Sequence, residues 1–403
     1  MLSLYLPLLL AGCGGGGVDP SSSTGPQASA PASSSSYPSA ANVTPSLDDS
    51  AEKIDAFAPG RILVRFQAGV GAARRLALLG AVGARETREI PGARVSVVTL
   101  PPGLDEHDAV ALFRARPEVK FAELDARVAP QAVPNDPSYG SQWHLPNVSC
   151  PTAWNTTTGD PGLIIAICDT GVDGTHPDLA AKMVAGWNVV SNSSDTTDCY
   201  GHGTAVAGTA AACANNGTGV ASVAWQCRIM PVRVTNDSTS GSAYYSDLAS
   251  AITWAADHGA KVANLSYIAS TSGTVSSAAQ YMQTKGGVTS VCAGNSSAFL
   301  SSPIDPNLLA VSATDPSNKL TSFSNYGNNI SICAPGISIL TTTRGGGYGS
   351  WWGTSFSAPI VSGVAALVES VNPALTALQV QTVLTSTADD LGPAGWDTQY
   401  GYG

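Results

Sequence analysis

The stretch Leu163-Ile164-Ile165-Ala166-Ile167-Cys168-Asp169-Thr170-Gly171 decides the fold of this chain. Its first six residues form a continuous apolar run, which is typical of a strand buried on both faces of a parallel sheet. The run ends at Asp169, and open α/β folds place their chemistry at the carboxyl ends of such strands. We therefore expect a doubly wound α/β domain with a mostly parallel sheet and a functional carboxylate at Asp169.

A second motif carries a histidine between two glycines. Gly201-His202-Gly203-Thr204 precedes the small-residue stretch Ala205 to Ala212, which predicts a helix that begins at His202. The flanking glycines let the backbone turn tightly and leave the imidazole open. Since a lone histidine is more often structural than catalytic, His202 becomes a candidate general base only in combination with other motifs.

A third motif places a serine at the start of a buried helix. Gly353-Thr354-Ser355-Phe356-Ser357-Ala358-Pro359 runs into Ile360 to Ser370, a stretch that is apolar nearly all round. Proline costs little in the first turns of a helix. The helix dipole and free backbone N–H groups there favour a developing oxyanion near Ser355. A serine that only caps the helix would show the same local pattern.

The chain order of the three motifs bears on the mechanism. Asp-Thr-Gly alone also fits an aspartic protease, but that mechanism needs a second such carboxylate, and the sequence holds no second copy. Asp169, His202 and Ser355 follow the order Asp, His, Ser of the subtilisin arrangement. From about Pro134 onward, the chain is identified as a member of the subtilisin-like (subtilase) family.

The resemblance implies a serine endopeptidase of the EC 3.4.21 class that hydrolyses proteins through an acyl-enzyme intermediate. Ser355 is then the nucleophile, His202 the general base and Asp169 the carboxylate that orients the imidazole. Asn295 follows a predicted strand at Val288 to Cys292 and matches the family's oxyanion asparagine. Two rivals stay open: an inactive protease fold that serves as a binding module, and an aspartic-type protease that uses Asp169.

The resemblance also implies where substrate binds. Family members hold the peptide as an added strand between two edge segments, which match Gly241-Ser242-Ala243 and Ser266-Tyr267-Ile268 here. Ile268 replaces a glycine of the relatives, so we expect a narrowed primary pocket and a preference for small residues. Ala205 replaces a common histidine. Phe356 replaces an oxidisable methionine, so we expect tolerance of peroxide.

Three segments match calcium-binding positions of relatives. They contain Asp136 in Asn135-Asp136-Pro137, Asp178 in His176-Pro177-Asp178-Leu179, and Asn215 in Asn215-Asn216-Gly217-Thr218. Oxygen ligands from distant segments would tie the mature N-terminus to the core. Residues 134–403 hold 16 Asp and Glu against 7 Lys and Arg. That acidic balance suits structural Ca²⁺ and argues against nucleic-acid binding. We expect no organic cofactor.

Residues 58–130 predict a separate small α+β domain. Ile62, Val64 and Phe66 alternate in a strand, Ala72 to Leu79 and Asp105 to Arg116 predict helices, and further strands are expected near residues 87–89, 94–100 and 119–124. The order βαββαβ is ferredoxin-like. Such a domain ahead of residues 134–403 resembles the inhibitory propeptides of subtilases, so we expect self-processing between Val128 and Pro134.

The N-terminus resembles a bacterial lipoprotein signal. Residues 2–12 form an apolar run too short to span a bilayer, and it ends at Cys13, which would be lipidated within the signal segment 1–13. Residues 14–57 are rich in Ser, Pro, Gly and Ala, which predicts a disordered tether. We expect a secreted or cell-envelope protein, monomeric, that meets the membrane only through its lipid and acts on proteins or peptides.

A family-typical final helix after Gly403 is missing, which indicates an early end of the chain.

None of the eight cysteines forms a C-x-x-C pair that would indicate zinc or redox chemistry. If Cys13 carries lipid, seven remain, so at least one thiol should stay free while at least one disulfide forms. Cys213 and Cys227 bracket a short polar loop and are the favoured pair.

Overall fold

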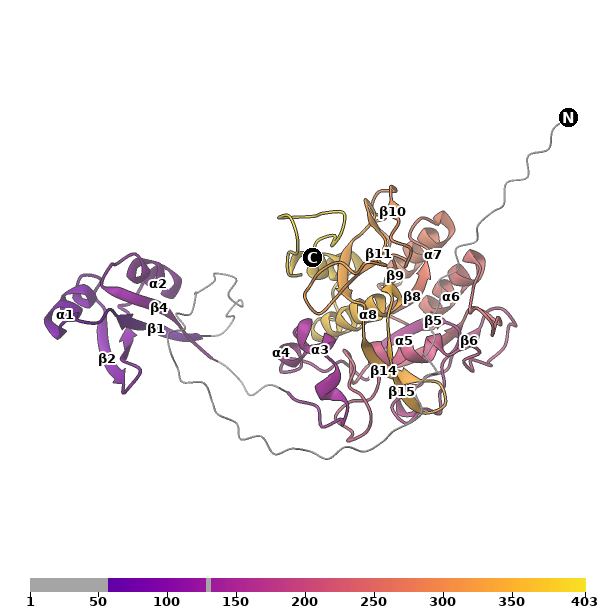
Figure 1. Cartoon of the computed structure of the whole chain (residues 1–403), viewed down its shortest axis with the longest axis horizontal. Helices are drawn as coiled ribbons and strands as arrows, with labels where there is room; N and C mark the ends of the chain where they lie inside the picture. Colours follow the sequence, from indigo (N-terminus) through magenta and orange to yellow (C-terminus); the bar gives the residue numbers. More distant parts are fainter. Residues whose placement is uncertain (1–56, 128–131) are drawn as a thin grey trace, which may run out of the picture. The chain divides into compact units, whose positions relative to one another are not determined.

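The computed structural model describes residues 57–127 and 132–403, which form two compact units with their boundary between Pro130 and Gln131 (Figure 1). Cys13, the signal segment, most of the tether and part of the expected processing region lie outside the described residues.

The first unit is a four-stranded antiparallel sheet with two helices. Ile62, Val64 and Phe66 point into a core that also takes Leu79 and Phe113 from the helices. The strand order β2-β3-β1-β4 and the succession βαββαβ confirm the expected ferredoxin-like unit. Its elements are β1 (Phe57–Phe66), α1 (Ala72–Gly80), β2 (Arg85–Ile90), β3 (Val95–Thr99), α2 (Glu106–Arg114) and β4 (Val119–Ala126).

The second unit is built on a seven-stranded parallel sheet of order β13-β11-β9-β8-β5-β7-β6. Short additional pairs, β10 with β12 and β14 with β15, lie outside it. The sheet strands are β5 (Ile164–Asp169), β6 (Trp187–Asn188), β7 (Arg228–Arg233), β8 (Val262–Ile268), β9 (Val288–Cys292), β11 (Leu309–Thr314) and β13 (Ile332–Pro335). The others are β10 (Phe299–Leu300), β12 (Tyr326–Gly327), β14 (Ile339–Thr343) and β15 (Gly347–Trp351).

Helices cover both faces of this sheet, as expected for a doubly wound domain. The apolar side chains of β5 alternate between two cores: Ile165 and Ile167 pack with α5 and α8, and Ala166 and Cys168 pack with α6 and α7. Helices α6 and α7 lie side by side in Figure 1. The helices are α3 (His144–Asn147), α4 (Cys150–Ala153), α5 (His202–Ala211), α6 (Tyr245–Asp257), α7 (Gly273–Thr284), α8 (Thr354–Val371) and α9 (Ala377–Ser386).

Strand β5 lies where the order of the strands reverses. The chain leaves β5 for β6 and β7 on one side, and β8, β9, β11 and β13 follow on the other. Open α/β sheets bind their ligands in the crevice beyond the carboxyl ends of the strands at such a point. Asp169 is the last residue of β5, so it stands in that crevice.

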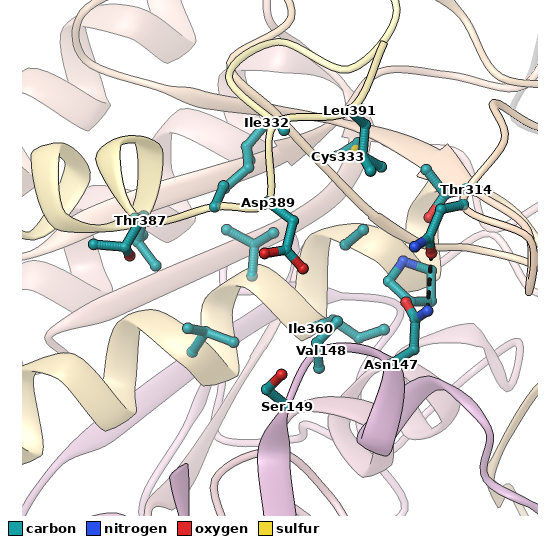
Figure 2. Close-up of a pocket in the computed structure, with 18 of the residues that line it drawn as sticks. Asn147, Val148, Ser149, Thr314, Ile332, Cys333, Ile360, Thr387, Asp389 and Leu391 are labelled. Carbon is teal, nitrogen blue, oxygen red and sulfur yellow. Dashed lines mark hydrogen bonds between the residues drawn. The ribbon is translucent and has the colours of Figure 1, made fainter. Parts of the chain in front are cut away.

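Helix α8 is apolar and long enough to cross a membrane, but 78% of it is buried within the unit, as expected of a core helix. Beside it lies an apolar cavity of about 240 Å³, between α8, α9 and β13 (Figure 2). Ile360, Cys333 and Thr387 are among its lining residues, and none of the predicted site residues is. This cavity is therefore separate from the candidate active site.

The expectation of at least one disulfide is wrong for the described residues, because all seven cysteines there are reduced thiols, including the favoured pair Cys213 and Cys227. The buried ammonium group of Lys182 lies near both sulfurs and donates a hydrogen bond to the carbonyl oxygen of Trp225. Burial raises the pKa of both thiols, and Lys182 opposes that shift. The short separation of Cys213 and Cys227 along the chain suggested a disulfide, but in the fold both thiols lie near the ammonium group of Lys182.

Candidate active site

Asp169 and His202 meet at the carboxyl end of β5. The carboxylate is fully buried, and its two oxygens lie 2.8 and 3.0 Å from the Nδ1 atom of His202. The segments approach so closely that a Cβ on Gly203 would lie 2.1 Å from the carbonyl oxygen of Gly171. Glycine after the histidine is thus a steric requirement for this contact. The Asp169 carboxylate therefore holds the imidazole of His202 through Nδ1.

Ser355 lies in the first turn of α8, whose N-cap is Gly353 with a φ of 128°. The helix begins at Thr354, as the sequence pattern indicated. The Oγ of Ser355 donates to the carbonyl oxygen of Ser266 at 3.3 Å, and the Oγ of Ser266 donates to the carbonyl oxygen of Ser355 at 2.7 Å. These bonds place the nucleophile candidate against the end of β8.

Aromatic contacts bring the histidine to the serine segment. The ring of His202 lies 5.7 Å from that of Phe356 and 6.5 Å from that of Trp351, both edge to face. His202 and Ser266 also line one small hollow. The structure therefore gathers Asp169, His202 and Ser355 at one edge of the sheet.

Asn295 follows β9 and reaches the same helix terminus. Its Oδ1 atom accepts hydrogen bonds from the backbone N–H and the hydroxyl of Thr354, each at 2.9 Å. The Nδ2 donor of the same carboxamide lies beside Gly353, where an added Cβ would be 3.0 Å away. The first-turn N–H groups of α8 have no acceptor within the helix, so the terminus is suited to a negative charge.

The two predicted substrate segments lie beside His202. The hydroxyl of Tyr267 donates to the carbonyl oxygen of Gly241 at 2.8 Å, which joins the segments behind a hollow lined by Thr170, Tyr200, His202, Ser240, Gly241, Ser266 and Tyr267. The carbonyl oxygen of Ser242 accepts a bond from Thr235 at 2.6 Å, and Ala243 packs against the α6 and α7 core. Ile268 directs its side chain at Gly294, where an added Cβ would lie 2.7 Å from Cδ1. It fills space directly before Asn295.

The predicted calcium residues also come together. Asp136 is 5% exposed and Asp178 is fully buried. Asp136 accepts from the N–H of Asn215 at 2.7 Å, whereas Asp178 accepts from the side chain of Asn216 at 3.0 Å and the N–H of Val220 at 3.0 Å. The Oδ1 of Asn215 is turned to the backbone N–H of Asn135, 3.3 Å away.

Sequence reasoning missed two residues of these sites. Thr354 orients Asn295 through two hydrogen bonds. Its position directly before Ser355 in the third motif could have indicated this role. Tyr348 places a buried hydroxyl near Asp178, and burial together with the charge of Asp178 raises the pKa of Tyr348. It comes from the β15 strand, 170 residues along the chain from Asp178, so no local pattern could indicate it.

A serine at a helix N-terminus, with a histidine and a buried aspartate beside it, defines the class of serine hydrolases. Residues 160–403 match the subtilase family (peptidase S8), and residues 45–125 match the family of the fervidolysin N-terminal prodomain. The chain belongs to the subtilase family and is a subtilisin-like serine protease with an N-terminal prodomain.

The chain is also similar to individual proteases of this kind. The chain is 37% identical to a thermophilic serine proteinase of Bacillus sp. strain AK1, over 86% of each chain. It is 40% identical to thermitase of Thermoactinomyces vulgaris, over 65% of this chain and 94% of thermitase. A solved protease structure from Pseudoalteromonas arctica superposes with a TM-score of 0.57 at 30% identity and covers 64% of this chain and 93% of that one.

Proposed function

We propose that this protein hydrolyses peptide bonds by acyl transfer, with Ser355 as nucleophile, His202 as general base and Asp169 as orienting carboxylate. The observation that carries the proposal is the contact of both Asp169 oxygens with Nδ1 of His202 beside the serine end of α8. A buried carboxylate in this position holds the imidazole with its proton on Nδ1.

The geometry implies a sequence of proton movements. The Nε2 atom of His202 takes the hydroxyl proton of Ser355 as Oγ attacks the carbonyl carbon, and the imidazolium then gives that proton to the leaving amine. Water enters, loses a proton to Nε2 and attacks the ester carbon, and the imidazolium gives that proton to the departing Oγ, which regenerates the hydroxyl of Ser355. Asp169 stabilises the imidazolium at both stages. The tetrahedral intermediate would receive hydrogen bonds from Nδ2 of Asn295 and the backbone N–H of Ser355.

Replacement of the orienting carboxylate tests these roles. Asp169→Asn should lower kcat by about 10⁴-fold, because the amide favours the wrong imidazole tautomer. His202→Ala should abolish turnover, whereas His258→Ala is a matched control because that imidazole is exposed on the end of α6. Full activity in Asp169→Asn would exclude the proposed triad, and an acid pH optimum of the wild type would favour the aspartic-type rival.

Substrate preference follows from Ile268. Its side chain fills the space in front of Gly294, so a peptide held between Gly241–Ala243 and Ser266–Ile268 would present its scissile residue to a narrowed pocket. We expect alanine at that position to be cleaved faster than phenylalanine. Ile268→Gly should reverse the preference, and an unchanged ratio of kcat/KM values for the two substrates would contradict this assignment.

Calcium fits the acidic cluster of Asp136 and Asp178. No described group of three or more His, Cys, Asp and Glu side chains converges on a metal position. A cation here would therefore need amide and backbone oxygens as well, which Ca²⁺ accepts readily. Both carboxylates are buried, and within the described part of the chain neither forms an ion pair with Lys, Arg or His, so a bound cation would offset their charge. Asp136, Asp178 and Asn215 are the proposed holders, and the ion would join the N-terminal segment of the protease domain to the loop that contains Asn215.

The prodomain suits a self-processing precursor. We infer that residues 58–130 inhibit the protease until cleavage between Val128 and Pro134, and that the mature protein is secreted and monomeric. One relative, from Xanthomonas campestris, is named an extracellular protease. Lipidation of Cys13 would tether the unprocessed precursor to the cell envelope until that cleavage. Cys13→Ser should move the precursor from the membrane fraction to the medium, and an unchanged distribution of the precursor would contradict the anchor.

A further inference from the structure

A further aspartate, Asp198, lies between the two segments that carry Asp169 and His202. Its side chain is 2% exposed. The Oδ1 atom accepts hydrogen bonds from the hydroxyl of Thr170 at 2.7 Å, the N–H of Tyr200 at 3.0 Å and the N–H of Gly201 at 2.7 Å. One oxygen thus joins the residue after Asp169 to the two residues before His202.

The second oxygen binds the first turn of α5. Oδ2 accepts from the N–H of Thr204 at 2.9 Å and from the Thr204 hydroxyl. The Thr170 hydroxyl accepts in turn from the N–H of Gly203 at 2.9 Å, and the N–H of Thr170 donates to Oδ1 of Asp169 at 2.8 Å. His202 therefore stands on a backbone segment that is fixed on both sides and tied to the segment of Asp169.

The chemistry of this site requires a carboxylate. In the described part of the chain no cation forms an ion pair with Asp198, and Arg344 donates instead to its backbone carbonyl oxygen at 3.1 Å. A buried charge is unfavourable unless hydrogen bonds satisfy it, and five donors do so here. Asparagine would keep one acceptor oxygen and would set its NH₂ group against the N–H of Thr204.

We propose that Asp198 is a positioning residue of the protease. Its carboxylate sets the distance and direction between Asp169 and Nδ1 of His202 by tying Thr170 to the start of α5. This inference rests on the proposed roles of Asp169 and His202. Because Asp198 reaches neither Ser355 nor the substrate segments through any of these bonds, its loss should affect the chemical step rather than substrate binding.

The test compares Asp198→Asn with Asp195→Asn. Asp195 belongs to the same loop, but its side chain is 61% exposed and it pairs with Arg233 at 3.3 Å. Each full-length variant is matured with affinity-tagged wild-type protease, which is then removed, and Ser355→Ala taken through the same steps measures the background. Rates are divided by the concentration of active sites that a fluorophosphonate titrates. The low-field NMR resonance of the His202 Nδ1 proton reports the Asp169 contact directly.

In Asp198→Asn, kcat should fall about 10- to 100-fold, as for a displacement of about 1 Å in a catalytic group. KM should stay within about threefold of the wild-type value, and the Nδ1 proton resonance should shift or broaden. Asp195→Asn should match the wild type in all three. If Asp198→Asn does not fold, Thr170→Val, which removes only the bridging hydroxyl, should give the same kcat loss. Wild-type kcat and an unmoved resonance in a folded variant would overturn the inference, whereas full activity in His202→Ala would overturn the triad itself.

Discussion

Asn295 offers a sharp test of how the active site stabilises charge, because two substitutions separate its two hydrogen-bonding roles. Its Oδ1 atom accepts from Thr354, and its Nδ2 atom is the proposed donor to the oxyanion. Asn295→Asp keeps the acceptor and removes the donor. Asn295→Leu removes both.

The expected magnitudes follow from these contacts. Loss of one oxyanion donor raises the barrier by about 2.7–4 kcal/mol, which is about 10²- to 10³-fold in kcat. The loss of kcat in Asn295→Asp should lie at the upper end of this range, because the negative charge of the new carboxylate also repels the oxyanion. Asn295→Leu additionally loses two hydrogen bonds to Thr354, each worth about 1 kcal/mol of folding stability. Its melting temperature should therefore fall, whereas kcat should fall no further than in Asn295→Asp.

The assay measures kcat and KM with a peptide anilide, together with thermal unfolding. Asn328→Leu is the control, since that side chain is exposed and, among the described residues, bonds only to the carbonyl oxygen of Ser301 at 3.3 Å. KM should change little in either Asn295 variant, because the donor acts on the transition state. A loss of less than about tenfold in kcat in both variants would refute the oxyanion role.

Three further outcomes are expected. Dilute peroxide should leave the wild type active and should inactivate Phe356→Met. Position 356 is buried beside His202, and only the variant has an oxidisable thioether at that position. An equal loss of activity in both proteins would contradict this prediction. Burial raises the pKa of Glu369 to about 7 from its ordinary value of 4.5, so the stability it contributes is full below about pH 4.5 and is lost as the pH rises through 7, by at most about 3 kcal/mol. The free energy of unfolding of Glu369→Gln should lack that decline with pH. If the wild type and Glu369→Gln show the same dependence of stability on pH, Glu369 does not have this role. Chelation of Ca²⁺ should lower the melting temperature of the wild type but not of Asp178→Asn, and a chelator effect of equal size in both would remove Asp178 from the site.

Much of the fold could be predicted because its signals are local. The apolar run that ends at Asp169 is buried against a core on each face, as its composition indicated. The alternation of Ile62, Val64 and Phe66 and the amphipathic helices indicated the ferredoxin-like unit. The serine helix begins at Thr354 because Gly353, at positive φ, precedes it.

The supporting contacts could not be predicted in the same way. Asp198 looks like an ordinary loop acid until the fold encloses it between Thr170 and Thr204, and Tyr348 reaches Asp178 only through the folded hairpin of β14 and β15. The expected disulfide between Cys213 and Cys227 was wrong because their separation along the chain says nothing of Lys182. Such long-range contacts depend on tertiary packing, which periodicity does not encode.

The central claim is that Ser355 is the nucleophile of a self-processing protease. Wild type and Ser355→Ala, expressed as full chains in buffer that contains calcium, would be compared by intact mass and by labelling with a fluorescent fluorophosphonate. We predict that only the wild type loses the residues up to about Pro134 and takes up the label, at Ser355. Processing and labelling of Ser355→Ala at the wild-type level, or neither reaction in the wild type, would contradict the account.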